Sequence, residues 1–376
     1  MKTIIHFFTR IQLLFRAKWY FSIPSQKKII LYDFNRPDVL SYYLKTNDTY
    51  LLETRLRKIN IYILFKSLIR HMWRWRFFSG YIVEYIQEVN PKLVITYIDN
   101  NSQFYQLKNF FPNTTIAFVQ NGMRGHSNDV FGLLESGKIY TKNFAVDKMF
   151  VWNNKVGEMY KKYLGGNYYT IGSLKNNHVT LKRKKKQKKN ILFLSEFRDV
   201  NPTKHLSRDY YAIEKKLIPF LYNFCQKNSF TFEVCANLKN SFDEFNFYKN
   251  LIPGKNWKFL ERKNQFSSYC HTDNALVTIF ISTALGFESI ARGNRTGAFA
   301  LRYKATKIKS HKLGWPFIFS ENGKTWTQKY DEKIFKRILT YLISSPLKTY
   351  QIYQRNNFSK LITRTEGNKK FLRLIN

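Results

Sequence analysis

Acidic residues are scarce in this chain of 376 residues. Only 25 Asp and Glu stand against 63 Lys and Arg, and the formal net charge is +38. A surplus of this size creates a strong positive field, which suits nucleic acid, an anionic membrane surface or a phosphorylated substrate as partner. Asn, Ile, Tyr and Phe are also abundant, so part of the Lys excess is equally consistent with an AT-rich genome.

Cysteine is rare too, and long apolar runs are missing. Cys225, Cys235 and Cys270 show no CxxC spacing, so we expect free structural thiols in a reducing compartment. The longest apolar run, 275–281, is far shorter than the ~18 residues that span a bilayer. Basic residues interrupt the apolar N-terminal stretch and no small-residue cleavage site follows it, so we expect no signal peptide and a cytoplasmic protein.

Several catalytic motifs are absent. Neither GxxxxGK[ST] nor GxGxxG occurs, so no P-loop and no dinucleotide site is implied. HExxH, CxxC and DxD are also missing, and a dedicated metal site lacks support. We therefore expect neither a metal nor a cofactor.

Short β-rich runs alternate with helix-like stretches in both halves of the chain. They cover 28–34, 93–98, 115–120, 148–152 and 168–172, then 190–196, 230–236, 257–261, 275–281 and 297–301. This alternation is typical of βαβ units around a parallel sheet. The basic run 181–190 indicates a solvated linker. The sequence therefore predicts an α/β protein with two Rossmann-like parallel-sheet domains that face a cleft, with ligands outside the carboxyl ends of the strands.

Two stretches of the first half mix apolar and basic side chains. Residues 1–21 place apolar residues at helical spacing, with Arg10 and Arg16 away from that stripe. The longest helical stretch, 61–89, interleaves Trp73 and Trp75 with arginines. Both patterns are typical of a protein that lies on an anionic membrane. Helices packed on the first domain, with snorkelling arginines, are the alternative.

A first polar cluster follows the predicted strand at 115–120. Gln120, Asn121, Gly122 and Arg124 come where that strand opens into the cleft. Gly122 would let the backbone turn or approach a ligand, and Arg124 can fork onto a phosphate or carboxylate. His126 has a reference pKa near the working pH and is a candidate general base. A turn with one exposed His is the simpler alternative.

A second cluster follows the predicted strand at 275–281. Ser282 and Thr283 stand where a helix should begin, and hydroxyls with free N–H groups at such a point form an anion site. Glu288 follows about one and a half turns later, where its carboxylate can accept hydrogen bonds from sugar hydroxyls. A capping box does not explain Glu288, because the third position after Ser282 is Leu285. An N-cap with a solvated Glu is the alternative.

Two weaker clusters precede and follow the linker. In "LSEFRD" (194–199), Ser195 and Arg198 could hold a phosphate and Glu196 a hydroxyl, although an ordinary loop with a salt bridge is as good an interpretation. In "IGSLKNN" (171–177), Lys175 is a further candidate phosphate contact in the expected hinge.

These motifs together resemble a known family. The segment 146–177, with "FVQNGMRG" before it and "ISTALGFESIARG" after it, is similar to bacterial surface-carbohydrate (O-antigen) biosynthesis proteins. The resemblance implies a GT-B fold, with the acceptor on an N-terminal domain, 1–178, and a nucleotide-activated sugar on a C-terminal domain, 191–335. A linker at 179–190 and C-terminal helices at 336–376 complete this division.

The resemblance also implies roles for individual residues. Ser282, Thr283 and Glu288 look like the nucleotide-phosphate and ribose contacts of GT-B enzymes. The segment 120–122 resembles the Gln-His-Gly turn of polyol-phosphate and sialyl transferases. Asn121 stands here where that turn has His, so the role of base passes to His126, Asp99 or Glu196.

The leading hypothesis is a metal-independent GT-B glycosyltransferase of surface-polysaccharide assembly. It would use a nucleotide-sugar donor and a lipid-linked or oligosaccharide acceptor, and would lie on the inner face of the inner membrane. Ser282, Thr283, Arg198, Ser195 and Lys175 would stabilise the departing phosphate. The alternatives are a polyol-phosphate transferase of the teichoic-acid kind, a non-catalytic scaffold and a nucleic-acid-binding protein. Against the last, basic residues are spread along the chain and no helix-turn-helix, RRM or zinc pattern occurs, so we expect no specific nucleic acid.

Overall fold

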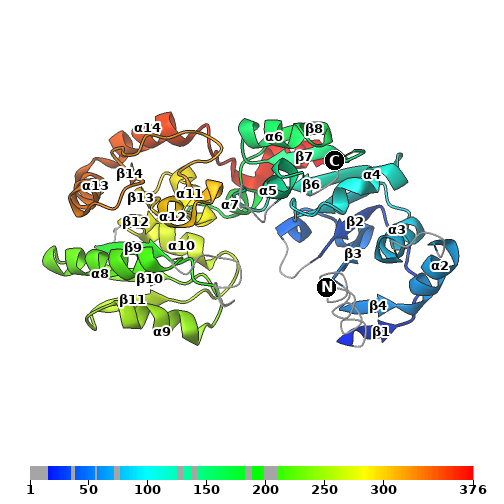
Figure 1. The fold of residues 1–376 in the computed structure, drawn as a ribbon, viewed down its shortest axis with the longest axis horizontal. Helices are drawn as coiled ribbons and strands as arrows, with labels where there is room; N and C mark the ends of the chain where they lie inside the picture. The colour runs from blue at the N-terminus through cyan, green and yellow to red at the C-terminus, as the bar shows by residue number, and fades with distance from the viewer. Residues whose placement is uncertain are drawn as a thin grey trace. The chain divides into compact units, whose positions relative to one another are not determined.

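The computed structural model describes residues 16–34, 39–55, 57–71, 77–124, 130–137, 142–182, 189–198 and 210–375. These residues form two compact units, each with its own six-stranded sheet (Figure 1). Unit 1 takes the described residues up to Asn121, with those of 139–151 and 157–169. Unit 2 takes those of 122–138, 152–156 and from Thr170 onward.

The sheet of unit 1 has the strand order β3-β2-β5-β6-β7-β8. Its strands are β2 (Ile29–Tyr32), β3 (Thr49–Leu52), β5 (Leu93–Thr96), β6 (Thr115–Val119), β7 (Ala145–Val151) and β8 (Gly165–Thr170). The pairs β2·β3, β2·β5, β5·β6 and β6·β7 are all parallel. The strand β6 is buried from Ile116 to Val119, which is why its sequence is a continuous apolar run. The five strands predicted for this half are confirmed.

The remaining elements of unit 1 lie around this sheet. They are β1 (Lys18–Tyr20), β4 (Lys58–Asn60), α2 (Ile61–His71), α3 (Phe77–Val89), α4 (Leu107–Phe110), α6 (Asn154–Lys161) and the 3₁₀ turns at Val39–Tyr42, Thr46–Asp48 and Phe104–Gln106. The expectation of one helix over 61–89 is wrong. The helices α2 and α3 lie side by side, because Lys66 and Arg70 of α2 form ion pairs with Glu88 and Glu84 of α3 at 2.5 and 3.0 Å. Residues 72–76, with Trp73 and Trp75, lie outside the described residues.

The predicted helix over 1–21 is also wrong at its end. Residues 1–15 lie outside the described residues, but Lys18–Tyr20 form β1, which pairs in parallel with β4. The Lys18 N–H donates to the carbonyl of Arg57 at 2.8 Å, so this segment obtains its hydrogen bonds from a strand partner rather than from a helix. No described helix is long and apolar enough to cross a membrane.

The sheet of unit 2 has the order β11-β10-β9-β12-β13-β14, and every neighbouring pair in it is parallel. Its strands are β9 (Asn190–Leu194), β10 (Thr231–Cys235), β11 (Trp257–Leu260), β12 (Val277–Phe280), β13 (Thr296–Phe299) and β14 (Trp326–Thr327). The five strands predicted for this half are confirmed, and the two-residue β14 was missed. Of the basic run 181–190, residues 183–188 lie outside the described residues.

Helices cover both faces of the second sheet. The helices of unit 2 are α5 (Val130–Glu135), α7 (Leu174–His178), α8 (Ala212–Lys227), α9 (Phe242–Leu251), α10 (Ser267–Asn274), α11 (Ala284–Ala291), α12 (Arg302–Thr306), α13 (Glu332–Ser344), α14 (Leu347–Phe358) and α15 (Lys369–Ile375), with 3₁₀ turns at Lys309–His311 and Glu366–Asn368. One apolar core joins the strands to α8 and α13, through residues such as Leu217 and Ile338. The other joins them to α11 and α14, through Phe287 and Phe358. The alternating sequence and the doubly covered sheet therefore agree.

The last described residues fasten onto the segment around α7. The side-chain amide of Asn368 donates to the carbonyl of Leu174 at 2.8 Å, and the Thr365 N–H donates to the Asn177 side chain at 2.9 Å. Gly172 has a φ of 71°, and a Cβ there would lie 2.3 Å from the Thr363 carbonyl oxygen. Only glycine fits this close approach.

The three cysteines are free thiols, as expected. Cys225 and Cys235 are buried, and burial raises the pKa of each to about 12. Both therefore stay protonated in the apolar core and pack as small hydrophobic side chains.

Candidate active site

Two of the predicted clusters meet at the carboxyl edge of the second sheet. The strands β9 and β12 are neighbours, so the residues after each of them lie side by side. Glu196 follows β9, and its carboxylate accepts hydrogen bonds from the Ser282 N–H at 2.5 Å and the Ser282 hydroxyl at 2.6 Å. Glu196 thus holds the loop that follows β12. The sequence predicted both residues but not this contact.

A buried arginine completes that cluster. Arg302 begins α12 and contacts the carboxylates of Glu196 and Glu214 at 3.1 and 2.5 Å. Its guanidinium also lies 4.0 Å from the ring centroid of Tyr210. Burial raises the pKa of Glu214, and the charge of Arg302 opposes that shift. Both oxygens of Glu196 are therefore engaged, one by Ser282 alone and the other by Ser282 and Arg302 together.

The helix α11 begins at this edge as predicted. Thr283 is its N-cap, with its hydroxyl accepting from the Leu285 N–H at 3.4 Å. Ser282 and Thr283 are partly exposed, so the positive end of the helix is open to an anion. Gly286 allows α11 to approach β12, because a Cβ there would lie 2.1 Å from the Phe280 ring.

Glu288 is buried inside unit 2, so the alternative of a solvated Glu is wrong. The hydroxyls of Ser173 and Tyr269 donate to its two carboxylate oxygens at 2.5 and 2.9 Å. Burial raises the pKa of Glu288, and the nearby charge of Lys175 opposes this shift. Burial in turn lowers the pKa of Lys175, and Glu288 opposes that shift. The expected hinge residue Lys175 and the predicted ribose contact Glu288 are thus brought together.

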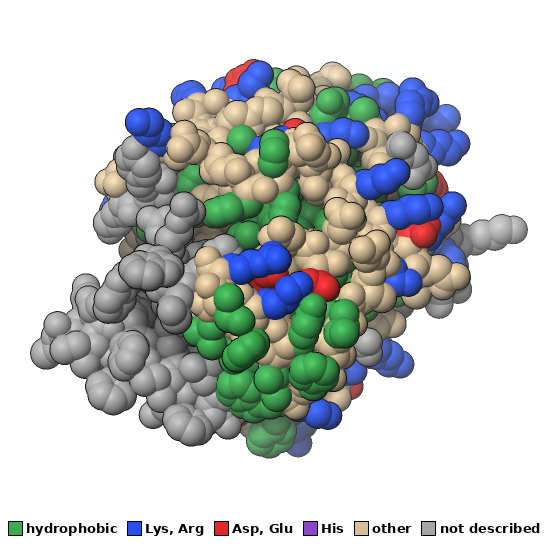
Figure 2. Space-filling model, turned by 90° about the vertical axis from the view of Figure 1, so that its right-hand side faces the viewer, with side chains coloured by type: hydrophobic (Ala, Val, Ile, Leu, Met, Phe, Trp, Pro, Cys, Tyr) green, Lys and Arg blue, Asp and Glu red, His purple; other side chains and the backbone are tan. Residues whose placement is uncertain are grey.

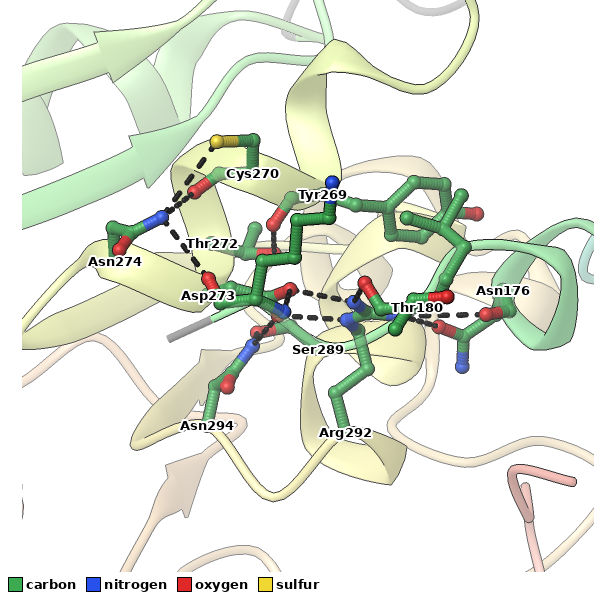
Figure 3. A network of polar contacts seen from close by, with 12 residues as sticks. Asn176, Thr180, Tyr269, Cys270, Thr272, Asp273, Asn274, Ser289, Arg292 and Asn294 are labelled. Carbon is green, nitrogen blue, oxygen red and sulfur yellow. Dashed lines mark hydrogen bonds and ion pairs between the residues drawn. The ribbon is translucent and has the colours of Figure 1, made fainter. Parts of the chain in front are cut away.

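A second buried arginine fixes the segment that carries Lys175 (Figure 3). Arg292, at the end of α11, donates two hydrogen bonds to the carboxylate of Asp273, at 2.7 and 2.5 Å. The same guanidinium donates to the side chain of Asn176 at 3.1 Å and to the carbonyls of Val179 and Thr180 at 3.0 and 3.3 Å. Residues 176–180 are therefore tied to α10 and α11. Sequence reasoning missed this network, since nothing distinguishes Arg292 from the many other basic residues.

The remaining donor-side candidates lie at the same edge. The Ser195 hydroxyl accepts from Tyr248 at 2.9 Å and from the Phe197 N–H at 3.1 Å. Arg198 is exposed, with its guanidinium 5.7 Å from the Tyr210 ring centroid. A cavity of 340 Å³, lined by residues 238–243, lies in the loop after β10, the strand next to β9.

The acceptor-side candidates follow strands of the first sheet. Asp99 is buried and accepts hydrogen bonds from the Asn121 N–H at 3.1 Å and the Tyr160 hydroxyl at 2.6 Å. Gln120 and Arg124 are also buried. Gly122 has no positive φ and a Cβ there would meet no described atom within 4 Å, so the turn itself does not require glycine. The expected approach of a ligand to Gly122 stays a prediction. His126 lies outside the described residues.

Metal ligands do not gather in the part of the chain that the structure describes. No group of three His, Cys, Asp or Glu side chains there could hold a metal ion.

Comparisons with known proteins address the family and the fold. Residues 117–376 match the model of a protein family described as "putative O-antigen biosynthesis protein". No curated protein matches the sequence. Among solved structures, the chain is similar to UDP-GlcNAc 2-epimerase from Neisseria meningitidis bound to UDP-GlcNAc, with a TM-score of 0.56, 10% identity, and coverage of 93% of this chain and 100% of that one.

Two further solved structures are similar. MnaA from S. aureus with UDP has a TM-score of 0.54 at 13% identity, with 93% of this chain and 95% of that chain covered. The wall teichoic acid polymerase TagF, soaked with CDPG, has a TM-score of 0.51 at 10% identity, with 93% and 88% covered. At such identities the likeness shows the fold alone. The predicted GT-B fold class, with two parallel six-stranded sheets, is confirmed.

Proposed function

Because this chain belongs to the O-antigen biosynthesis family whose model matches residues 117–376, we propose that it is a GT-B glycosyltransferase of surface-polysaccharide assembly. It would move a sugar from a nucleotide-sugar donor to a lipid-linked or oligosaccharide acceptor, on the cytoplasmic face of the inner membrane. The observation that carries this proposal is the buried Glu288 with Ser173, Tyr269 and Lys175 beside the start of α11. The proposal is supported by three structures of similar fold, which were obtained with UDP-GlcNAc, UDP and CDPG.

The donor site would use the two kinds of group that a nucleotide diphosphate needs. Each carboxylate oxygen has about two acceptor positions, so Glu288 retains capacity for ribose hydroxyls beside the bonds from Ser173 and Tyr269. The partly exposed start of α11, with Thr283, offers N–H groups to the phosphates. Lys175 and Arg198 add positive charge. Preorganised donors of this kind stabilise a departing diphosphate without a metal.

The acceptor hydroxyl must lose a proton during transfer. Of the three candidate bases, Glu196 is engaged by Ser282 and Arg302, and Asp99 by Asn121 and Tyr160. His126 remains the third. A general base contributes about 10²–10⁴-fold to rate, so single substitutions of these residues would separate them in a turnover assay.

The experiment that tests the donor site is a thermal-shift screen with CMP, CDP, UDP, GDP and dTDP. A ligand at 100 times its Kd stabilises the folded state by about 2.7 kcal/mol. For a domain of the size of unit 2 that is a shift of roughly 5–10 °C. We expect one nucleotide to shift the wild-type chain and the Glu332→Ala control, whose Glu is exposed on α13, but not Glu288→Ala. Equal shifts in Glu288→Ala and the control would refute the assigned site.

The second candidate function is a polyol-phosphate transferase. The segment Gln120-Asn121-Gly122 follows β6, and TagF, a polymerase soaked with CDPG, has a similar fold. A polyol-phosphate transferase would therefore bind CDP in preference to UDP and turn over a CDP-polyol. Nucleotide binding without turnover of any donor would favour a non-catalytic scaffold instead.

A further inference from the structure

The helix α2 has its apolar stripe turned toward solvent. Ile61, Phe65, Leu68 and Ile69 recur on one face of the helix and are 43%, 64%, 40% and 62% exposed. A helix of a globular protein normally turns such a stripe to the core. The stripe spans about two turns, roughly 12 Å of helix.

The polar side of α2 is the side that packs against its neighbour. Lys66 contacts Glu88 of α3 at 2.5 Å, and Arg70 contacts Glu84 at 3.0 Å. Ser67, between them, is buried. Ile63 is also fully buried on this side. The inner side of α2 is therefore held by Ile63, Ser67 and the two ion pairs, and the stripe lies on the opposite side of the helix.

The segment around β1 extends the stripe. Trp19, Phe21 and Ile23 are 45%, 69% and 65% exposed. The Phe21 ring contacts that of Tyr62 edge to face, with the centroids 6.1 Å apart, which places Phe21 beside α2. Figure 2 shows hydrophobic side chains gathered on the face where α2 and β1 lie. Monomeric proteins rarely expose contiguous apolar surface of this kind without a use for it.

Positive charge surrounds this apolar surface. No Asp or Glu occurs among residues 16–32 or 54–83. Lys18, Arg57 and Lys58, at the ends of β1 and β4, are exposed. The acids that contact these segments are paired: Glu84 and Glu88 of α3 with α2, and Glu53 with Arg57 at 3.8 Å. Lys18 and Lys58 form no ion pair with a described residue. An occupant of this surface must therefore be apolar at its centre and negative at its rim.

We propose that this face, formed by the α2 stripe with Trp19, Phe21 and Ile23, is a docking surface for an anionic lipid bilayer. Apolar side chains would enter the head-group boundary while the surrounding lysines and arginines contact the phosphates. A second copy of this chain fits less well, because two such faces would bring the positive charges of Lys18, Arg57 and Lys58 close to the same charges of the other copy. Residues 1–15 carry Lys2 and Arg10 and no acid, so they have the same sign as the surface.

The docking surface would bring the enzyme to the membrane that holds the proposed lipid-linked acceptor, but membrane docking does not require transfer activity. The proposed function and the docking surface are tested separately, because nucleotide binding is measured by thermal shift and lipid binding by vesicles without nucleotide.

The test is sedimentation of the full chain with two kinds of vesicle. One contains phosphatidylcholine alone, and the other phosphatidylcholine with phosphatidylglycerol. The variant is Phe65→Ser with Ile69→Ser, and the matched control is Ile318→Ser with Ile352→Ser, two residues of unit 2 that are 92% and 60% exposed. All three proteins have the same net charge, and thermal melting confirms that each is folded.

We expect the wild-type chain and the control to bind the anionic vesicles, and the α2 variant to lose about tenfold or more in affinity. Vesicle binding by the α2 variant equal to that of wild type would mean that charge alone suffices, and would overturn the proposal. It would also be overturned if the wild-type chain bound no vesicles. A wild-type dimer that the α2 variant converts to a monomer, without vesicle binding, would assign the face to a second copy instead.

Discussion

Replacing Arg292 by Met should strongly destabilise unit 2. Arg292 is 3% exposed, and its guanidinium makes two contacts with Asp273, of 2.7 and 2.5 Å, besides four hydrogen bonds to residues 176–180. Met has a similar length and leaves little cavity, so the cost comes from the charge that remains. Among the described residues, Asp273 would retain the Asn294 amide at 3.0 Å and the more distant Lys182 N–H at 3.4 Å.

The expected magnitude follows from that unpaired carboxylate. Removing one partner of a buried ion pair costs about 3–5 kcal/mol. In a unit of this size, that lowers Tm by roughly 6–20 °C. Urea unfolding followed by circular dichroism measures the loss of free energy. The control is Lys304→Met, which breaks an exposed 3.1 Å pair with Glu321 and should change stability by at most about 1 kcal/mol.

A double-mutant cycle isolates the pair. Adding Asp273→Asn to Arg292→Met removes the unpaired charge, so the double variant should be more stable than the sum of the two single losses predicts, by about 1–3 kcal/mol. Additive losses, or a loss below about 1 kcal/mol for Arg292→Met alone, would refute the reasoning that the pair is buried and coupled.

Two further predictions concern α11. Gly286→Ala should cost about 1–3 kcal/mol, because its Cβ would overlap the Phe280 ring, whereas Gly122→Ala, with open space at its Cβ, should leave the thermal melting temperature nearly unchanged. Burial raises the pKa of Glu288 above the reference value of 4.5. The folded state therefore binds this proton more tightly than the unfolded state does. As a result, the contribution of Glu288 to the free energy of unfolding falls as pH rises from about 4.5 through the folded pKa. Melting temperatures across that window should therefore decline less in Glu288→Gln than in wild type, while Glu332→Gln should follow wild type; parallel curves for all three would contradict the shift.

The strands were predictable because their signal is local. Runs such as 115–119 and 277–280 are apolar except for one threonine in each, as is typical of strands covered on both faces. The polar residues that follow them mark the carboxyl edge, where ligands of such sheets generally bind. The start of α11 at Thr283 was predictable for the same reason. The sequences of β1, β3, β4 and β14 mix apolar and polar residues, so no apolar run marked these strands.

The contacts that define the site were not predictable, because they join residues far apart in the chain. Arg302 meets Glu214 across 88 positions, and Ser173 meets Glu288 across 115. Nothing local distinguishes these residues from other charged or hydroxyl side chains. The pairing of α2 with α3 was missed for the same reason, because Lys66 meets Glu88 across 22 positions and Arg70 meets Glu84 across 14.

The contacts between residues 363–368 and the α7 segment have a consequence for how the protein folds during its synthesis. Leu174 and Asn177 receive their partners, Asn368 and Thr365, only about 190 positions later in translation. At a synthesis rate of about 5–20 residues per second, that interval lasts roughly 10–40 s. During it the stretch with Lys175 is exposed to chaperones and proteases without its final contacts. The candidate donor site can therefore be completed only after the strands and helices around it have been made. The proposed nucleotide binding would then begin only when synthesis of unit 2 is nearly complete.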